Sequence, residues 1–232
     1  MMILQRNFLN VMNVFDIIGP VMIGPSSSHT AGASRAGLVA RRLLGESPVK
    51  AKITLYGSFA KTYAGHGADK AIIGGILGYD SGDVRIRDSF SYAKKENLEF
   101  EFVISDEEAQ HPNTAKIELQ GADGGAVCVT VCSVGGGVVN VVNIDGGDVM
   151  FSAEYDTTVI FNEDKAGVIA QISSVFAEFG INIAFMRAFR KYEGKDAIMV
   201  IETDQGVDEE LTEKLRSLNN IRKVITIPPL SV

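Results

Sequence analysis

The chain has 232 residues, of which 46% are hydrophobic and 22% charged, so it is long enough for one large or two modest cores and too apolar to be disordered. Its net charge of -7 is spread without any run of Lys or Arg, which argues against a nucleic-acid-binding or anionic-membrane-binding surface. The start, MMILQRNFLN, lacks a secretory signal pattern, and no apolar stretch approaches the roughly 20 residues of a membrane span. We therefore expect a globular, cytoplasmic protein whose partners are small molecules or other proteins.

The first distinctive segment is IGPSSSHT, whose polar residues show no apolar periodicity and cannot be core. It precedes a helix predicted from Ala31 to Leu44 that ends at Gly45. Either Ser28 or Thr30 is predicted as the N-cap, and hydroxyls beside free first-turn N–H groups predict a site for a carboxylate or phosphate. The candidate anion-binding residues are Ser26, Ser27, Ser28, His29 and Thr30. The alternative is that these side chains only cap and turn the chain.

Arg35 and His66 are two further candidate residues of the site. Arg35 lies one turn into the same predicted helix, where its charge can support the anion. His66 stands between two glycines, directly before a second helix predicted from Ala68 to Leu77. Glycines beside a histidine let backbone and substrate approach closely, and histidine is a general base near neutral pH.

The third histidine, His111, is followed by Pro112 and Asn113. All three histidines fall in polar, Gly-rich or Pro-broken surroundings, although each one taken alone is more commonly structural or merely exposed. They share no metal-ligand spacing, so no metal site is predicted. Together they make His66, His111 and Asn113 candidates for proton chemistry.

The β segments of the first part are KITLYG, EFEFVIS, AKIELQ and AVCVTVCSV, the last joined to VVNVVNID by a hairpin at Gly135 to Gly137. They predict an α+β domain over residues 1–150 with a mostly antiparallel sheet. Cys128 and Cys132 lie four apart on one strand, with sulfurs about 13 Å apart, which is beyond disulfide reach. They are predicted as buried thiols, and two thiols are too few for an iron–sulfur cluster.

A Gly-rich, acidic stretch from Gly146 to Asp156 is the predicted linker. From Thr157 the pattern runs strand, helix, strand, strand, helix, strand, which predicts a ferredoxin-like βαββαβ domain over residues 156–232. We expect a four-stranded antiparallel sheet with both helices on one face and the other face solvated or covered by something else.

Each helix of this second domain shows an apolar stripe. The first is predicted to end at Gly180, and its stripe consists of Val168, Ile169, Ile172, Val175, Phe176 and Phe179. The stripe of the second consists of Leu211, Leu215 and Leu218. Polar residues near the first strand and helix, Asn162, Asp164, Gly167 and Asn182, are candidates to bind an amino acid, although Asn, Asp and Gly are also ordinary turn residues.

Three stretches, IGPSSSHTAGASRAG, GSFAKTYAGHGADKAIIGG and HPNT, resemble the signatures of bacterial iron–sulfur-dependent L-serine dehydratases, in particular their separate beta chain. DKAGVIAQISSVFAEFGINIAFMR resembles an ACT domain, with Ala166 where that pattern often has proline. The resemblance covers nearly the whole chain. It implies that the first domain is of the allosteric-substrate-binding type, which also occurs in some phosphoglycerate dehydrogenases, and that an ACT domain follows.

The resemblance also implies an L-serine ammonia-lyase, which converts L-serine to pyruvate and ammonia by removing the α-proton and expelling a hydroxyl polarised by a [4Fe–4S] cluster. In that family the cluster cysteines belong to an alpha chain, so this chain alone should be inactive. Residues Ser26 to Thr30 would meet the substrate carboxylate, His66 would be the base, and His111 and Asn113 would line the same site. The alternative is a regulatory module that binds serine or another small acid and self-associates through its ACT domain.

Overall fold

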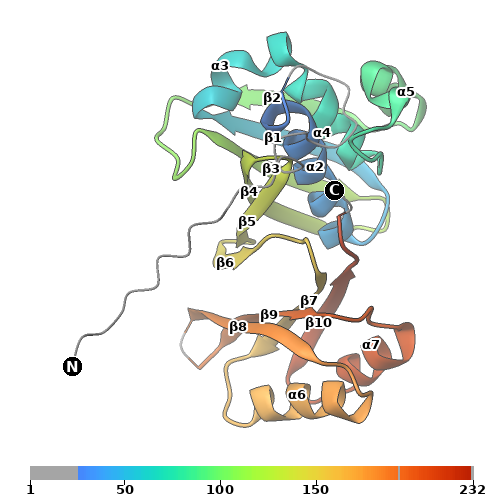
Figure 1. Ribbon diagram of the computed structural model, residues 1–232, viewed down its shortest axis with the longest axis vertical. Helices are drawn as coiled ribbons and strands as arrows, with labels where there is room; N and C mark the ends of the chain where they lie inside the picture. The colour runs from blue at the N-terminus through green and yellow to red at the C-terminus, as the bar shows by residue number, and fades with distance from the viewer. Residues whose placement is uncertain (1–25, 193, 231–232) are drawn as a thin grey trace, which may run out of the picture.

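The computed structural model describes residues 26–192 and 194–230, which form two lobes, each built around a β-sheet (Figure 1). The helical elements of the first lobe are a π-helical turn η1 (Ser28–Gly32), α2 (Ala33–Leu44), α3 (Gly57–His66), α4 (Ala68–Ile76), a 3-10 turn η2 (Val84–Asp88) and α5 (Ser89–Lys95). Its strands are β1 (Pro48–Tyr56), β2 (Glu99–Ile104), β3 (Asn113–Gly121), β4 (Ala126–Gly135), β5 (Val138–Ile144) and β6 (Gly147–Phe151).

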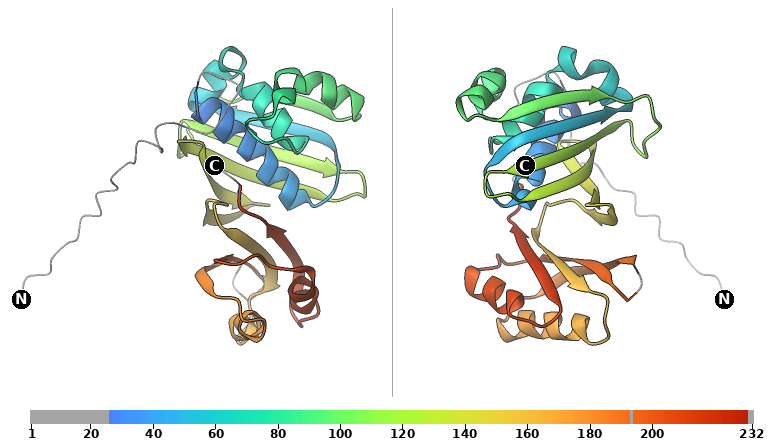
Figure 2. Two further views of the ribbon diagram at one scale, coloured as in Figure 1. Left: turned by 45° about the vertical axis from the view of Figure 1, so that its right-hand side comes forward. Right: turned by 180° about the vertical axis from the view of Figure 1, so that it is seen from behind.

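The six strands of the first lobe form one sheet in the order β2-β1-β3-β4-β5-β6. Only β1 and β2 run parallel, so the prediction of a mostly antiparallel sheet is confirmed. The helices cover one face, and Figure 2 shows the opposite face open. Alternation along the strands explains this, since Ile53 and Ile117 are buried under the helices while Lys52 and Glu118 lie on the open face.

Helices α2 and α4 pack against each other through glycine. A Cβ on Gly75 would lie 1.9 Å from the carbonyl oxygen of Ser34, and one on Gly37 would lie 2.2 Å from that of Ile72. The two backbones therefore touch, which sets the position of α2 and of the η1 turn that leads into it. The helix ends as predicted at Gly45, which is left-handed with φ 82° and donates its N–H to the carbonyl of Arg41.

Several features of the first lobe differ from the sequence prediction. Helices α3 and α5 were not predicted, because their sequences show little apolar periodicity. Strand β6 occupies part of the predicted linker, so residues 152–155 alone connect the two sheets. Cys132 is buried as predicted, but Cys128 is only half-buried, and both are free thiols.

The second lobe is the predicted ferredoxin-like βαββαβ unit. Its elements are β7 (Asp156–Glu163), α6 (Val168–Glu178), β8 (Ile183–Tyr192), β9 (Asp196–Thr203), α7 (Glu209–Arg216) and β10 (Ile221–Ile227). The strands form an antiparallel sheet in the order β10-β7-β9-β8, with both helices on one face, so this prediction is confirmed (Figure 1).

The ends of α6 and α7 follow from local chemistry. Helix α6 finishes in a Schellman motif, in which Ile181 N–H donates to Phe176 O and Gly180 N–H to Ala177 O. Asp208 caps α7 by accepting the N–H of Leu211 at 2.9 Å. One predicted core position is wrong, since Ile169 is 52% exposed while the remainder of the α6 stripe packs inward.

The face of the second sheet opposite its helices is covered by the first lobe. Val159, Ile198 and Ile227 share one hydrophobic core with Ile144 and Phe151. Two hydrogen bonds reinforce this junction. Leu230 N–H donates to the carbonyl of Ala153, and the guanidinium group of Arg42 donates to the carbonyl of Pro228. The two lobes therefore meet along a shared apolar interface. Within the described ranges, no helix is both long and apolar enough to cross a bilayer.

Candidate functional site

The polar run Ser26–Thr30 enters the helix instead of capping it. Thr30 N–H donates to Ser26 O and Gly32 N–H to Ser27 O, both at 2.9 Å, which makes a π-helical turn continuous with α2. The prediction that Ser28 or Thr30 is the N-cap is therefore wrong, because both lie inside the helical turn. Single π turns of this kind are often found at functional sites.

His29 is the centre of this cluster and is only 7% exposed. Its Nδ1 lies 3.4 Å from Ser26 Oγ, and its Nε2 lies 3.0 Å from Thr62 Oγ1 and 3.4 Å from Ser58 Oγ. Thr62 gives its own hydroxyl proton to the Ser58 carbonyl at 2.8 Å, so its oxygen is an acceptor toward His29. This network places the ring proton on Nε2 and leaves Nδ1 as an acceptor for the Ser26 hydroxyl.

His66 lies against His29 at the last turn of α3. The ring centroids are 5.0 Å apart in a T-shaped arrangement, and the Phe59 ring makes a second T-shaped contact with His29 at 5.1 Å. His66 itself is exposed to solvent. Burial lowers the pKa of His29 and the neighbouring His66 lowers it further, so His29 is neutral at pH 7. The structure thus pairs a buried neutral imidazole with an exposed one.

Helix α3 supplies residues that the sequence analysis missed. Ser58, Thr62 and His66 recur at every fourth position, so all three lie on one face of the helix, the face turned toward His29. The signal was present as S-x-x-x-T-x-x-x-H within GSFAKTYAGH, but it becomes visible only once the segment is known to be helical.

The HPNT segment reaches the same place from another direction. The carbonyl of Pro112 accepts the N–H of Ser58 at 2.6 Å and that of Phe59 at 3.3 Å, which satisfies the start of α3. Gly57 is required at this contact, because its φ is +56° and a Cβ would lie 2.6 Å from Pro112 O. His111 lies in the same loop, where its Nδ1 accepts the N–H of Asn113 at 3.1 Å.

Asn113 connects HPNT with the polar run. Its Nδ2 lies 3.5 Å from the carbonyl oxygen of Ser133 on β4, and the Ser133 hydroxyl donates to the Ser28 carbonyl at 3.0 Å. Among the residues that the structure describes, no partner lies within reach of the buried Asn113 Oδ1. All three signature stretches therefore converge, with His29 and His66 in direct contact and HPNT linked through Pro112 and Ser133. Ser133 is a further residue that the sequence analysis missed.

Arg35 differs from its expected place beside an anion. It is buried, and one guanidinium N–H donates to the carbonyl of Gly137 at 2.5 Å, in the turn between β4 and β5. The side chain thereby braces the β4–β5 hairpin against α2.

The candidate amino-acid ligands of the second lobe occupy opposite ends of its sheet. Asn162 is aligned with Ala197, and the following Asp164 forms an ion pair with Arg190 at 2.7 Å. Gly167 follows shortly after them, with φ 89°, directly before α6. Asn162 is almost fully buried, and its Oδ1 has no partner in the part of the chain that the structure describes.

Asn182 lies at the other end of the same sheet. Its side-chain amide donates to Asp204 at 2.8 Å. Asp204 directly follows Thr203, and Thr203 is aligned with Asp156 at the start of β7. Six residues of strand separate Asp156 from Asn162, which corresponds to about 20 Å. Within one chain, Asn182 therefore cannot contact the same small ligand as the other three.

The thiols do not fit an iron–sulfur cluster. Burial raises the pKa of both Cys128 and Cys132, and Cys132 lies 3.3 Å from the Thr114 hydroxyl. A cluster requires three or four thiolates, whereas these are two protonated thiols. Over residues 26–192 and 194–230, no group of three His, Cys, Asp or Glu side chains is arranged to hold a metal ion.

The neutral state of His29 predicts a pH effect on stability. The ordinary pKa of 6.5 applies to the unfolded chain, and burial depresses the folded value, so the unfolded chain binds more protons once the pH falls below 6.5. The stability that depends on neutral His29 is present above pH 6.5 and is lost as the pH falls toward the folded pKa. Urea unfolding measures this effect. Between about pH 7.5 and about pH 5.5, the free energy of unfolding should fall less for His29→Gln than for the native chain. An equal fall in unfolding free energy for the two chains would contradict the neutral, buried state of His29.

Sequence comparisons match both lobes to described protein families. Residues 13–99 match the family model described as serine dehydratase beta chain, and residues 157–220 match that of the ACT domain. The chain is 44% identical over 215 residues to the "Probable L-serine dehydratase, beta chain" of Bacillus subtilis (strain 168), covering 93% of this chain and 97% of that one. It is 36% identical over 206 residues to the L-serine dehydratase beta chain of Peptoniphilus asaccharolyticus, covering 88% and 91%.

A more distant relative shares a smaller part. The D-3-phosphoglycerate dehydrogenase of Methanocaldococcus jannaschii is 32% identical over 99 residues, which is 41% of this chain and 19% of that protein.

Proposed function

Because this chain belongs to the family of L-serine dehydratase beta chains, we propose that it is the beta subunit of an L-serine ammonia-lyase and completes an active site on an alpha chain. The observation that carries the proposal is the convergence of SSSHT, the face of α3 that ends in His66, and HPNT around one histidine pair. A histidine pair beside hydroxyls suits the removal of a proton from a bound amino acid.

The substrate carboxylate is proposed to bind at the start of the η1 turn. The helix begins earlier than expected, so the carboxylate would meet Ser26, Ser27 and the first N–H groups, while Ser28, His29 and Thr30 lie behind them. Hydroxyls and unsatisfied first-turn N–H groups favour an anion at this end of a helix. Ser133 supports the arrangement from β4 through its bond to the Ser28 carbonyl.

His66 is proposed as the base that takes the α-proton. It is exposed, so a substrate held on a partner chain can reach it, whereas His29 is enclosed by α3 and held by Thr62 and Ser58. A neutral His29 against His66 places no positive charge beside the base, and it keeps the ring of His66 in position. His111 and Asn113 are proposed to line the same site, where the buried Asn113 Oδ1 can accept a hydrogen bond from the substrate.

The [4Fe–4S] cluster that the family resemblance implies is proposed to belong to the alpha chain, since the thiols of this chain do not fit it. This chain's residues bind the carboxylate and move the proton. On its own, the chain should therefore form no pyruvate.

Association with the alpha chain tests the proposal. Co-expression should yield a complex containing this chain and a cysteine-bearing, brown, oxygen-sensitive partner, visible by size-exclusion chromatography under anaerobic conditions. Asn113→Asp, which places a charge at a half-buried position of the proposed shared site, should weaken the complex, whereas Asp123→Asn at a distant exposed turn should not. A colourless chain that never retains an alpha partner would contradict the proposal and favour the regulatory module.

Self-association through the ACT lobe is also proposed. Strand β8 lies at the sheet edge, and Phe185 on it is 49% exposed, next to the exposed Tyr155 ring at 5.8 Å. An open edge with exposed aromatic side chains favours pairing with a second copy. Light scattering that shows a monomer at working concentration would contradict this.

A further inference from the structure

A cavity of about 160 Å³ lies in the second lobe, at the end of its sheet where β7 begins and β10 ends. Its lining residues are Asp156, Thr157, Thr158, Val207, Thr226, Ile227 and Pro228. Liquid water occupies about 30 Å³ per molecule, so the space suits an ion with a few waters and is smaller than most sites for organic ligands. The histidine cluster lies elsewhere, in the first lobe.

Three polar side chains of the cavity wall share one face of the sheet. Val159 belongs to the core that joins the two lobes, and side chains alternate along a strand, so Asp156 and Thr158 point to the helix-covered side. Thr226 on β10 is aligned with Thr158 and shares that face. Asp156 and Thr158 are two residues apart, which is about 7 Å along the strand. One small ligand between them, directly or through a water, can therefore contact both side chains.

The hydroxyl group of Thr158 lacks a partner. The residue is 0% exposed, and its Oγ1 meets no hydrogen-bonding atom within the ranges that the structure describes. A buried hydroxyl without a hydrogen bond is costly, and native proteins rarely leave one unless a water or an ion supplies the contact. The orphaned oxygen therefore indicates an occupant of the cavity beside it.

Asp156 adds a negative charge to the same space. Over residues 26–192 and 194–230, its carboxylate forms no ion pair and accepts no hydrogen bond, whereas its backbone carbonyl accepts the hydroxyl of Thr203. Burial raises the pKa of this carboxyl, and no charged side chain offsets that effect. Gly206 covers it closely, because a Cβ there would lie 3.8 Å from Asp156 Oδ1. The carboxylate is thus half-buried without a counter-ion.

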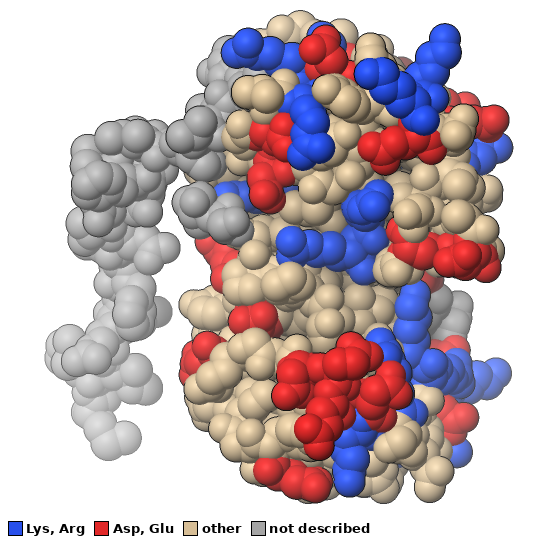
Figure 3. Space-filling view, turned by 90° about the vertical axis from the view of Figure 1, so that its right-hand side faces the viewer, with Lys and Arg blue, Asp and Glu red and all other residues tan. Residues whose placement is uncertain are grey.

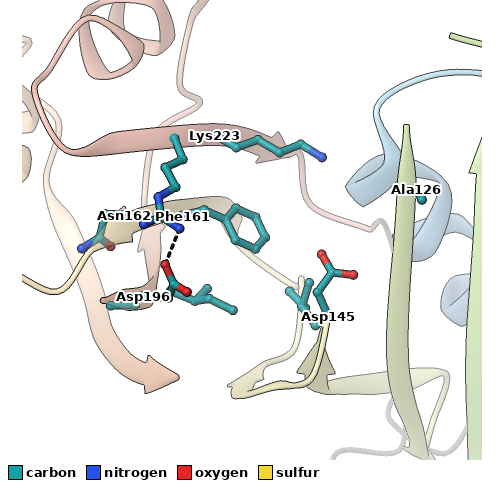
Figure 4. A pocket seen from close by; sticks show the side chains of 10 residues that line it. Ala126, Asp145, Phe161, Asn162, Asp196 and Lys223 are labelled. Carbon is teal, nitrogen blue, oxygen red and sulfur yellow. Dashed lines mark hydrogen bonds and ion pairs between the residues drawn. The ribbon is translucent and has the colours of Figure 1, made fainter. Parts of the chain in front are cut away.

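The surroundings of the cavity favour a cation. None of the described residues that line it is Lys or Arg. The loop at Val207 leads into the acidic first turn of α7, and in Figure 3 Asp and Glu side chains gather on the side of the second lobe where α7 lies. A larger cavity between the lobes differs, because Lys223 extends along it and Arg222 is paired there with Asp196 (Figure 4).

The available oxygen ligands select a monovalent ion. One carboxylate offsets one positive charge, and an excess of charge in a half-buried site is costly. Ca²⁺ takes about six to eight oxygen ligands, commonly from several carboxylates, and the transition metals prefer nitrogen or sulfur. Neutral oxygens, such as carbonyls, replace the hydration shell of K⁺ in proteins.

We propose that this cavity binds a monovalent cation of the size of K⁺ between the carboxylate of Asp156 and the hydroxyl of Thr158, with Thr226 beside them. The ion joins the start of β7, the end of β10 and the loop before α7. Pro228 of the cavity wall also accepts the hydrogen bond of Arg42 from the first lobe, so the ion braces the junction of the lobes. This site goes beyond the proposed dehydratase function and does not depend on it.

Urea unfolding of the full chain tests the site. KCl is exchanged stepwise for tetramethylammonium chloride at constant ionic strength, because the methyl groups of tetramethylammonium keep oxygen atoms away from its charge. A cation that binds only the folded chain raises stability by mass action. With a Kd of about 10 mM, K⁺ at about 100 mM should raise the folded-to-unfolded ratio about tenfold. The effect should saturate, and ammonium, which is similar in size, should reproduce it.

Variants assign the effect to the cavity. Asp156→Asn and Thr158→Val should each remove most of the gain from K⁺. Thr158→Val should also be more stable than the native chain in tetramethylammonium, since a methyl group of the same shape replaces the unpaired hydroxyl. Asp123→Asn in an exposed turn and Thr54→Val on β1, both in the first lobe, should keep the full gain.

Three results would overturn the cation site. A single water in the cavity would leave stability equal in the two salts. A gain from K⁺ that survives in both Asp156→Asn and Thr158→Val would place the ion elsewhere. Ca²⁺ that reproduces the gain at a tenth of the K⁺ concentration would contradict a monovalent ion. None of these measurements needs the alpha chain, so the cation site and the proposed dehydratase function fail separately.

Discussion

Replacing His66 by alanine in the reconstituted dehydratase is expected to lower kcat by roughly 10²-fold or more, because a positioned general base contributes about that factor or more. His66 is exposed at the end of α3, so its removal leaves no buried cavity. Its contact with the His29 ring is lost, but His29 keeps its bonds to Thr62 and Ser58. The loss should therefore appear in turnover and not in the free energy of unfolding.

Controls make the His66 result specific. Lys61→Ala, on the exposed side of the same helix, should keep kcat within about twofold, since surface substitutions have small effects. The His66→Ala chain should still form the complex with the alpha chain, so that the lost turnover reports the missing base and not a lost assembly. A His66→Ala complex that keeps its kcat but changes its cooperativity toward serine would support the regulatory module instead.

Gly75→Ala is expected to destabilise the first lobe by about 3 kcal/mol, the upper part of the usual range for overpacking. The new methyl would lie 1.9 Å from the Ser34 carbonyl and 2.7 Å from the Leu38 nitrogen, both backbone atoms that cannot rotate away. Helices α2 and α4 must separate, and the η1 turn moves with α2. Activity with the alpha chain should fall together with stability, because His29 lies on that turn and Ser26 is hydrogen-bonded to it through Thr30.

Gly65→Ala is the matched control for stability. Gly65 lies within α3 at a helical φ, with no atom within 4 Å of an added Cβ, so alanine should stabilise the helix by up to about 1 kcal/mol. Urea unfolding of both variants measures the contrast. If Gly75→Ala were as stable as Gly65→Ala, the close approach of α2 and α4 would be wrong.

The second lobe was predictable because its elements have strong, regular periods. Its six elements alternate apolar and polar residues with clear changes of period, and Gly180 and Asp208 mark helix ends by local chemistry. Ile169 was wrongly predicted as a core residue. The apolar stripe inferred from the spacing on α6 is wider than the face of the helix that packs on the sheet. Nothing in the sequence showed that the other face of this sheet would be covered by the first lobe.

The segments that form the candidate site could be identified from the sequence, but their geometry could not. SSSHT, His66 and HPNT were identified as polar runs, yet the helix that positions His66 was missed because Phe59 is its only buried residue. The contact between His29 and Thr62 joins residues 33 apart, which no local pattern reveals. The N-cap was predicted at Ser28 or Thr30 because Ser and Thr generally favour caps. Both residues instead lie inside the helical turn, which starts earlier than their local preference indicates.

Pyruvate formation by mixtures of the two chains tests the proposed shared active site most directly. A fixed amount of cluster-loaded alpha chain, assayed anaerobically with L-serine, should form no pyruvate alone and should gain activity in proportion to added beta chain until the two are equimolar. The His66→Ala chain should form the complex and compete with the native chain without restoring activity. An alpha chain that is fully active alone, or equally active with the His66→Ala chain, would contradict the account.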